Sequence, residues 1–281
     1  MTRTELRITG REVSRRRQQG QPAAGALALR LRVAEHLVFT RIHAALGGRL
    51  QWAVSGGAPL ARDIAEFFHA AGMPILEGYG LTETSPLTHA NPIERAKAGS
   101  IGMPLPDTDA RVVDLESGTD VEPGAPGELL IRGPQVMKGY WQRAEATAET
   151  IRDGWLRTGD VATMDGEGYF AIVDRKKDVI NTAGFKVWPR EVEEVLYAHP
   201  AIRLAAVVGV PDDYRGEAVK ACVVLKDGPR AALSERDVIE FCRARLSAYK
   251  APRTVEFRDA LPVTAAGKML RRELRQGGPH A

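Results

Sequence analysis

The chain has 281 residues, of which 44% are hydrophobic and 27% charged, and its formal net charge is +3. This length allows two domains with a sizeable core, and so small a charge, spread along the chain, gives no argument for nucleic-acid binding. No window of eighteen apolar residues occurs, so the sequence predicts no transmembrane segment. Cys222 and Cys242 show no paired pattern, which argues against a disulfide or metal site and favours the cytoplasm.

The densest positive cluster lies at residues 11–17, near the start of the chain. A targeting peptide would need an apolar core after this cluster, and none follows, so we expect a disordered or frayed end. A helix is predicted over residues 26–46, because apolar residues recur at intervals of three and four and Gly47-Gly48 follows. That apolar face consists of Leu27, Leu31, Ala34, Val38, Ile42 and Ala45.

Two apolar strands, predicted at residues 50–54 and 73–76, each run into a glycine-containing loop. Between them we predict a helix that begins near Leu60, ends at Gly72, and has Leu60, Ile64, Phe67 and Phe68 on one face. This alternation is typical of a parallel α/β sheet, whose ligands bind at the carboxyl edge of the strands. The first loop, SGGAP at residues 55–59, is also compatible with a simple tight turn.

Residues 99–173 show short strands separated by glycine and proline, at 110–114, 127–132 and 169–173, with a short helix at 144–150. After Lys177 we predict a helix from Pro189, strands at 202–210 and 218–225, and a helix that Ser234 caps with Asp237. A strand at 254–258 and a basic tail helix follow.

The predicted fold class is therefore α/β. Residues 1–98 are predicted to be part of a parallel-sheet α/β domain, and residues 99–173 to form a β-barrel-like subdomain. Residues 174–177 are predicted to join these to an α+β domain at residues 178–281.

The second loop, residues 77–84, carries groups suited to a nucleotide. The Tyr79 ring can stack on a base, the Thr82 hydroxyl can bond a phosphate, and Glu83 can hold Mg²⁺. Further along, Trp155 leads into a predicted Gly159-Asp160 turn that would hold a carboxylate rigidly. Five consecutive charged residues then occupy positions 174–178. They indicate either a junction between two domains or a solvated loop between two strands.

The spacing of DGWLRTGD at residues 153–160 and DRKK at 174–177 resembles the fatty acyl-CoA synthetase signature of the AMP-forming, adenylate-forming ligase superfamily. Four other segments resemble that superfamily: SGGAP, GYGLTE at 78–83, GELLIRGPQVMKGYW at 127–141, and PVTAAGKMLRR at 262–272. The sequence is identified as the carboxyl-terminal half of an AMP-forming acyl-CoA synthetase of the long-chain fatty-acid–CoA ligase type. The resemblance implies that residues 1–98 are the remnant of a nucleotide- and acyl-binding domain, that residues 174–177 are a hinge, and that residues 178–281 are a mobile lid domain.

The resemblance implies a set of AMP/ATP-binding residues, with coenzyme A and a fatty acid as the other substrates. Tyr79 would lie along the adenine, Thr82 would touch the α-phosphate, and Glu83 would bind Mg²⁺. Asp160 would accept both ribose hydroxyls, and Arg175 would reach the same ribose. The full AMP/ATP-binding set is Gly56, Gly57, Ala58, Glu77, Gly78, Tyr79, Gly80, Asp160, Ile172 and Arg175.

The resemblance also implies that Lys268 is the adenylation lysine, bridging the substrate carboxylate and the α-phosphate. A lysine after a glycine turn is otherwise a solvated side chain. Lys177 would be the pivot whose rotation withdraws Lys268 and brings up a CoA-binding strand formed by Gly184, Phe185 and Lys186.

The superfamily's phosphate loop, of the form SGTTGxPKG, does not occur in residues 1–54. Two hypotheses follow. The chain is a truncated ligase completed by a partner chain or a longer product, or it is a catalytically incomplete fragment or nucleotide/CoA-binding module. An adenylation domain of a peptide synthetase fits less well. We expect a cytoplasmic protein, and peripheral membrane attachment stays open.

Overall fold

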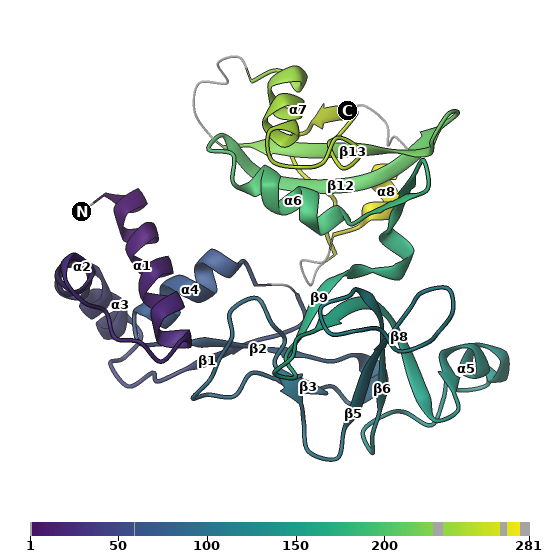
Figure 1. Ribbon diagram of the computed structural model, residues 1–281, viewed down its shortest axis with the longest axis horizontal. Coiled ribbons are helices and arrows are strands. Elements are labelled where there is room, and N and C mark those ends of the chain that lie inside the picture. Colours follow the sequence, from purple (N-terminus) through teal and green to yellow (C-terminus); the bar gives the residue numbers. More distant parts are fainter. Residues whose placement is uncertain (1, 59, 227–232, 265–268, 276–281) are drawn as a thin grey trace. The chain divides into compact units, whose positions relative to one another are not determined.

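A computed structural model describes residues 2–58, 60–226, 233–264 and 269–275 (Figure 1). The fold is mixed α/β, as predicted, and the chain divides into two compact units. Unit 1 comprises Met1–Thr158 and Ala162–Ile172, and unit 2 comprises Gly159–Val161 and Val173–Ala281. No helix in the described residues is both long and apolar enough to cross a bilayer. Cys222 and Cys242 are both buried free thiols.

The expected frayed start is wrong, because a helix, α1 (Arg3–Gln18), occupies it. Thr2 and Glu5 form a reciprocal capping box at its first turn. The helix lies along α4 (Arg62–Ala70), with Val13 buried and with Arg17 donating to the carbonyl oxygens of His69 and Ala70 (Figure 1). Packing against α4 therefore orders a segment that its basic composition alone predicts to be frayed and solvent-exposed.

The predicted helix over residues 26–46 is present as three consecutive helical pieces: α2 (Ala26–Ala34), the π-helical η1 (Glu35–Phe39) and α3 (Thr40–Ala45). Leu31, Val38 and Ile42 of the predicted face pack on the core formed by Ala34, Phe39, Ala71 and Met73. In α4, by contrast, Ile64 is exposed, and Ala65 and Ala70 are buried instead. The predicted face of that helix was therefore wrong in part.

The first sheet has the order β1 (Ala53–Ser55), β2 (Ile75–Tyr79), β3 (His89–Ala90) and β4 (Met103–Pro104). Strands β1 and β2 are parallel, as predicted, whereas β3 and β4 join them in antiparallel fashion. Loops after β1 and β2 therefore emerge at the same edge. The second predicted loop, residues 77–84, begins within β2 and ends in a short 3₁₀ helix, η2 (Thr82–Thr84).

The second sheet contains β5 (Asp109–Val113), β6 (Gly127–Arg132), β8 (Trp155–Met164) and β7 (Ile151–Arg152), and β9 (Phe170–Arg175) pairs with β8. The helix predicted at 144–150 is α5 (Ala144–Thr150). The Gly159-Asp160 turn was wrong: both residues lie inside the ten-residue strand β8, and Gly159 takes a φ of 69° without ending it.

His89 is buried in the core of unit 1, and its neutral form is favoured there. Its ring packs edge-on against Phe170 at 4.8 Å, and Nδ1 lies 3.0 Å from the Thr88 hydroxyl. Nε2 is buried without a hydrogen-bond partner among the described residues. Burial lowers the pKa of His89 from 6.5 to about 4.

The buried His89 predicts a loss of stability in mild acid. The unfolded chain binds a proton at this residue below pH 6.5, whereas the folded chain does so only near pH 4. Stability due to His89 is thus complete above pH 6.5 and falls by about 3 kcal/mol between pH 6.5 and 4. When unfolding by urea is measured across this pH range, His89→Asn should not show this decrease in the free energy of unfolding. The control variant His36→Asn, at an exposed site, should show it. Equal pH slopes in both variants would refute the assignment.

Unit 2 is built on a sheet with the order β11 (Phe185–Val187), β10 (Ile180–Thr182), β13 (Gly216–Leu225) and β12 (Ile202–Asp212). Strand β14 (Thr254–Phe257) runs parallel to β13. The helices are α6 (Pro189–Tyr197), α7 (Glu235–Arg243) and α8 (Arg271–Arg275), and the 3₁₀ turn η3 (Lys176–Asp178) precedes β10. Pro189 at the start of α6 and the Ser234–Asp237 capping box of α7 are as predicted.

Candidate functional site

The two glycine-containing loops of unit 1 lie side by side. Their strands are paired up to the last residue of β1, since Ser55 lies opposite Glu77. The Glu77 carboxylate accepts hydrogen bonds from the N–H groups of Leu60 and Gly99, at 3.4 and 3.2 Å, and so joins the segments around the loops. Gly56, Gly57 and Ala58 are exposed. This edge therefore offers open backbone to a ligand.

Gly78 and Gly80 differ in whether the surrounding structure has room for a side chain. A Cβ at Gly80 would lie 1.6 Å from the Pro86 carbonyl oxygen, so the loop itself requires glycine there. A Cβ at Gly78 would lie 3.1 Å from the Leu87 side chain, a contact that a small shift could relieve. Gly80 thus has a structural role in shaping the loop, whether or not a ligand is bound.

Tyr79, Thr82 and Glu83 all belong to this loop region. Tyr79 and Ile172 border the same hydrophobic cluster, and Thr82 is exposed. Glu83 is held in place by a residue that sequence reasoning missed: the Tyr140 hydroxyl donates to its Oε1 at 2.8 Å. That hydrogen bond raises the pKa of Tyr140. The only sequence signal for Tyr140 was its place in the GELLIRGPQVMKGYW segment.

The donor set at Glu83 fits a magnesium ion that is shared with a ligand. Among the described residues, no group of three or more His, Cys, Asp or Glu side chains could hold a metal. Mg²⁺ is commonly bound by one or two carboxylates together with substrate phosphates. The single carboxylate of Glu83 is therefore compatible with a Mg²⁺ ion whose other ligands include the phosphates of a nucleotide. It does not match a Mg²⁺ site made of protein ligands alone.

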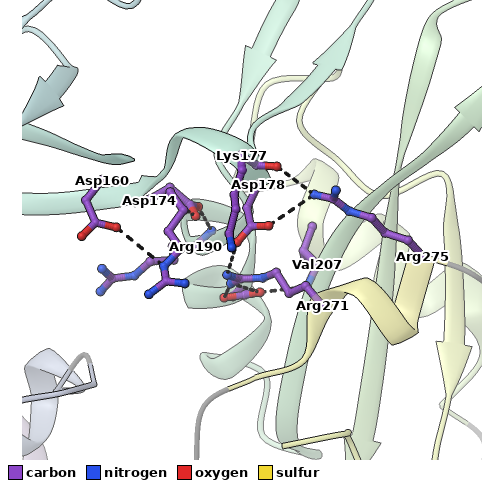
Figure 2. Close-up of polar contacts among 10 residues, drawn as sticks. Asp160, Asp174, Lys177, Asp178, Arg190, Val207, Arg271 and Arg275 are labelled. Atoms are coloured by element: carbon purple, nitrogen blue, oxygen red, sulfur yellow. Dashed lines mark hydrogen bonds and ion pairs between the residues drawn. The ribbon is translucent and has the colours of Figure 1, made fainter. Parts of the chain in front are cut away.

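In unit 2 the structure brings Asp160 and Arg175 together. The Arg175 Nε lies 3.6 Å from Asp160 Oδ1, and the aspartate is buried (Figure 2). This pair joins the β8 and β9 residues that the sequence assigned to one ribose. A carboxylate beside a guanidinium offers two acceptor oxygens, as the binding of two hydroxyl donors requires.

The charge run at residues 174–178 is not a solvated loop. Asp174 and Asp178 are buried, whereas the Lys176 and Lys177 side chains are exposed. Asp174 accepts hydrogen bonds at 2.8 Å from the backbone N–H groups of Arg175 and Arg190. Burial raises the pKa of Asp174, and these donors oppose the rise. The carboxylate thereby fixes the end of β9 to the first turn of α6.

Two further residues complete this cluster, and sequence reasoning missed their roles. Glu193 of α6, which is buried, pairs with the partly buried Arg271 of α8, whose Nη2 lies 2.8 Å from both Glu193 carboxylate oxygens. Burial raises the pKa of Glu193, and Arg271 opposes the rise. Arg271 is the last position of the PxTxxGKxxR pattern, but nothing in the sequence marks Glu193 as its partner.

The predicted CoA-binding residues occupy a tight hairpin between β10 and β11. Ala183 and Gly184 have φ values of 50° and 82°, which suit a two-residue hairpin turn. Phe185 is 54% exposed and stacks on Tyr249, with ring centroids 4.7 Å apart. Lys186 is exposed. The hairpin thus presents an aromatic face and a cation to solvent.

Lys268 lies outside the described residues. The residues that flank its segment are described: Val263 and Met269 form an antiparallel bridge, and the Leu270 N–H donates to the Pro262 carbonyl at 2.9 Å. The two ends of this segment are therefore joined within unit 2.

Comparison with known proteins gives two family matches: the AMP-binding enzyme model over residues 16–141, and the AMP-binding enzyme C-terminal domain model over residues 191–268. A long-chain-fatty-acid–CoA ligase of Escherichia coli O157:H7 is 49% identical over 243 residues, covering 86% of this chain and 41% of that protein. A feruloyl-CoA synthase of Amycolatopsis sp. is 46% identical over 231 residues, covering 81% of this chain and 46% of that protein.

Among solved structures, o-succinylbenzoate CoA synthetase from Bacillus subtilis, in complex with its acyl-adenylate intermediate, aligns with a TM-score of 0.73 and 32% identity. The alignment covers 84% of this chain and 49% of that one. The chain therefore spans less than half the length of the relatives that it matches.

Proposed function

The chain belongs to the AMP-binding enzyme family, and from that premise we propose that it supplies nucleotide- and CoA-binding residues to an AMP-forming acid–CoA ligase. In the first half-reaction a carboxylate oxygen of the acid attacks the α-phosphate of ATP and pyrophosphate leaves. In the second, the CoA thiol attacks the acyl carbon and AMP leaves. The long-chain fatty-acid–CoA ligase relatives favour a long-chain fatty acid as substrate, whereas the feruloyl-CoA synthase relative represents another class of acid.

The observation that carries this proposal is the pair of adjoining loops at the carboxyl ends of β1 and β2. Tyr79 would lie along the adenine, and Thr82 would contact the α-phosphate. Gly56, Gly57, Ala58, Glu77, Gly78 and Gly80 would form the surrounding backbone, and Ile172 would border the base. Bound Mg²⁺ would neutralise phosphate charge, and Glu83, which Tyr140 orients, would hold it.

Asp160 and Arg175 would hold the ribose, and the hairpin residues Gly184, Phe185 and Lys186 would contact CoA. The buried position of the Asp160 carboxylate beside Arg175 supports the first assignment. The exposed Phe185–Tyr249 stack supports the second, since an aromatic face can pack on a base or a pantetheine chain. Lys177 would be the pivot between the two half-reactions, and Lys268 would act in the first.

Asp160→Asn is expected to weaken AMP binding to the chain about tenfold, because a neutral amide offers ribose hydroxyls a weaker acceptor. Isothermal titration calorimetry with AMP measures this directly. Asp120→Asn, at a carboxylate that pairs with Arg111 in unit 1, is the matched control and should bind AMP normally. AMP affinity that is unchanged in Asp160→Asn would remove the ribose assignment.

A second candidate function is a nucleotide- or CoA-binding module without full catalysis. Exposed apolar side chains in unit 1 favour instead a ligase that is completed by further polypeptide. Leu29, Val33 and Leu37 are 65%, 40% and 45% exposed, and Val54, on the edge strand β1, is 63% exposed.

The deciding experiment is AMP release by the purified chain with ATP, Mg²⁺, CoA and a panel of fatty acids. Turnover supports a ligase that needs no further phosphate loop. AMP binding without turnover supports the module, or a ligase completed by a separate chain; adding the amino-terminal part of a relative then separates these two. No AMP binding at all would overturn the proposed function.

A further inference from the structure

The side-chain amide of Asn91 is buried in unit 1 and forms hydrogen bonds with both its nitrogen and its oxygen. Its Nδ2 donates to the carbonyl oxygens of Glu77 and Ser100, at 3.3 and 2.6 Å. Its Oδ1 accepts hydrogen bonds from the Lys97 N–H at 2.9 Å and from the Ser100 hydroxyl at 3.2 Å. An asparagine side chain has two N–H donors and an oxygen with two lone pairs, so its full hydrogen-bonding capacity is used. Asn91 therefore joins segment 91–100 to strand β2.

The same segment holds both the backbone and the side chain of Glu77. The backbone N–H of Asn91 donates to the Glu77 carbonyl oxygen at 3.2 Å, beside the bond from its own side chain. The N–H of Gly99 donates to the Glu77 carboxylate at 3.2 Å, and Gly99 takes a φ of 83°, which favours glycine. Since Ser100, the next residue, is bonded to Asn91, the direction of the Gly99 N–H also depends on that amide.

The Glu77 carboxylate connects the two glycine-containing loops. It also accepts the N–H of Leu60 at 3.4 Å, and Leu60 is the residue that follows the SGGAP loop. The loops are close to one another here, because a Cβ at Gly56 would lie 3.4 Å from the Gly78 carbonyl oxygen. One side chain thus links the end of the first loop to the start of the second, and Asn91 fixes the residue that carries it.

Stability alone gives no reason for a polar side chain at this buried position. A buried hydrogen-bonded group can often be replaced, together with its partners, by apolar groups of the same shape at little cost in stability. A fully bonded network instead specifies a single arrangement of the groups that it joins. Here those groups are the carboxyl end of β2 and the turn that contains Gly99.

We propose that Asn91 is a positioning residue which, through the Glu77 carboxylate, sets the spacing between the SGGAP loop and the loop at residues 77–84. A flat ligand that contacts both loops needs a fixed spacing, because dispersion attraction is lost as soon as a gap opens on one side. The consequence for AMP binding rests on the proposed function, whereas the coupling of Asn91 to Leu60 does not.

The coupling is tested by amide hydrogen exchange of the purified chain, followed by mass spectrometry. In Asn91→Ala, exchange is expected to rise about tenfold in the peptides that contain Leu60 and Gly99. Glu77→Ala should give the same rise at Leu60, and the double variant should exchange there no faster than either single variant. Unchanged exchange at Leu60 in Asn91→Ala, or rises that multiply in the double variant, would overturn the coupling.

Gln135→Ala is the matched control for the loss of a side-chain amide within unit 1. The Gln135 amide donates to the Thr108 hydroxyl at 2.7 Å and so joins two other segments of the unit. Exchange at Leu60 should be unchanged in this variant. A rise there equal to that of Asn91→Ala would show general loosening of unit 1 and would overturn the proposal.

Asn91→Ala leaves buried carbonyl groups without their donor and could unfold unit 1 as a whole. Asn91→Asp keeps an acceptor for the Lys97 N–H and the Ser100 hydroxyl but loses both side-chain donors. It should retain slow exchange in β6 while the peptide that contains Leu60 exchanges faster. Protection of Leu60 equal to that of the unchanged chain would overturn the proposal.

The consequence for ligand binding is measured by calorimetric titration with AMP. Asn91→Ala, or Asn91→Asp if the first variant does not fold, is expected to bind AMP about tenfold more weakly, and Gln135→Ala should bind it normally. Normal AMP affinity together with faster exchange at Leu60 would overturn the positioning role. An unchanged chain that binds no AMP would refute the proposed function, and hydrogen exchange would then still decide the coupling.

Discussion

Replacing Lys268 by alanine is expected to lower acyl-adenylate formation by about 10²–10³-fold. In the proposed first half-reaction an ammonium group bridges the substrate carboxylate and the α-phosphate, where negative charge concentrates as the new P–O bond forms. Alanine leaves that charge without its counterion. Thioester formation from supplied acyl-adenylate should stay close to normal, because the carboxylate is already bonded to phosphorus.

The two half-reactions are measured apart, by pyrophosphate exchange into ATP and by thioester formation, in the ligase completed with whatever polypeptide turnover requires. Lys226→Ala is the control, since the Lys226 side chain is exposed and its ammonium group donates to the Pro200 carbonyl oxygen. An equal decrease in both half-reactions would contradict the assigned role, and undiminished exchange would remove Lys268 from catalysis.

Replacing Gly80 by alanine is expected to cost about 4 kcal/mol of the free energy of unfolding. The added Cβ would lie 1.6 Å from the Pro86 oxygen, 2.6 Å from its carbonyl carbon and 2.9 Å from the Leu87 Cα. All three atoms are backbone, so no side-chain rotation relieves the clash and the loop must move. AMP binding should be lost together with the loop conformation.

Urea unfolding and AMP titration measure the two effects. Gly166→Ala is the matched control, because a Cβ there has none of the described atoms within 4 Å and Gly166 does not have a positive φ. That variant should unfold like the parent and bind AMP with the same affinity. A Gly80→Ala chain of normal stability would mean that residues 80–87 do not fold as described.

The elements predicted correctly are those whose signals are local. The capping box at Ser234 and the proline at the start of α6 specify their helices within one turn, and the structure has both helices. Helix α1 was missed because its order comes from contacts with α4, some fifty residues away in sequence. Strand β8 was missed because the glycine at 159 was interpreted as a turn, although its positive φ is accommodated inside the strand.

In the candidate site, too, local sequence signals were informative and long-range contacts were not predicted. Every candidate motif residue was proposed from a segment with a recognisable sequence pattern, and its role stays a prediction. The residues that orient them were not predicted: Tyr140 meets Glu83 across 57 positions, and Arg271 meets Glu193 across 78. Such partners are set by the packing of whole elements, and a single sequence carries no periodicity or spacing that would reveal them.

The structure describes five residues of helix α8, Arg271–Arg275, and a segment of this length does not persist as an isolated helix in water. Its order therefore depends on contacts with α6, β12 and the turn η3. During folding, α8 should be among the last elements of unit 2 to become ordered, and under stress among the first to detach. Mild heat or denaturant should therefore expose the backbone amides of α8 to hydrogen exchange while the β12–β13 sheet remains intact.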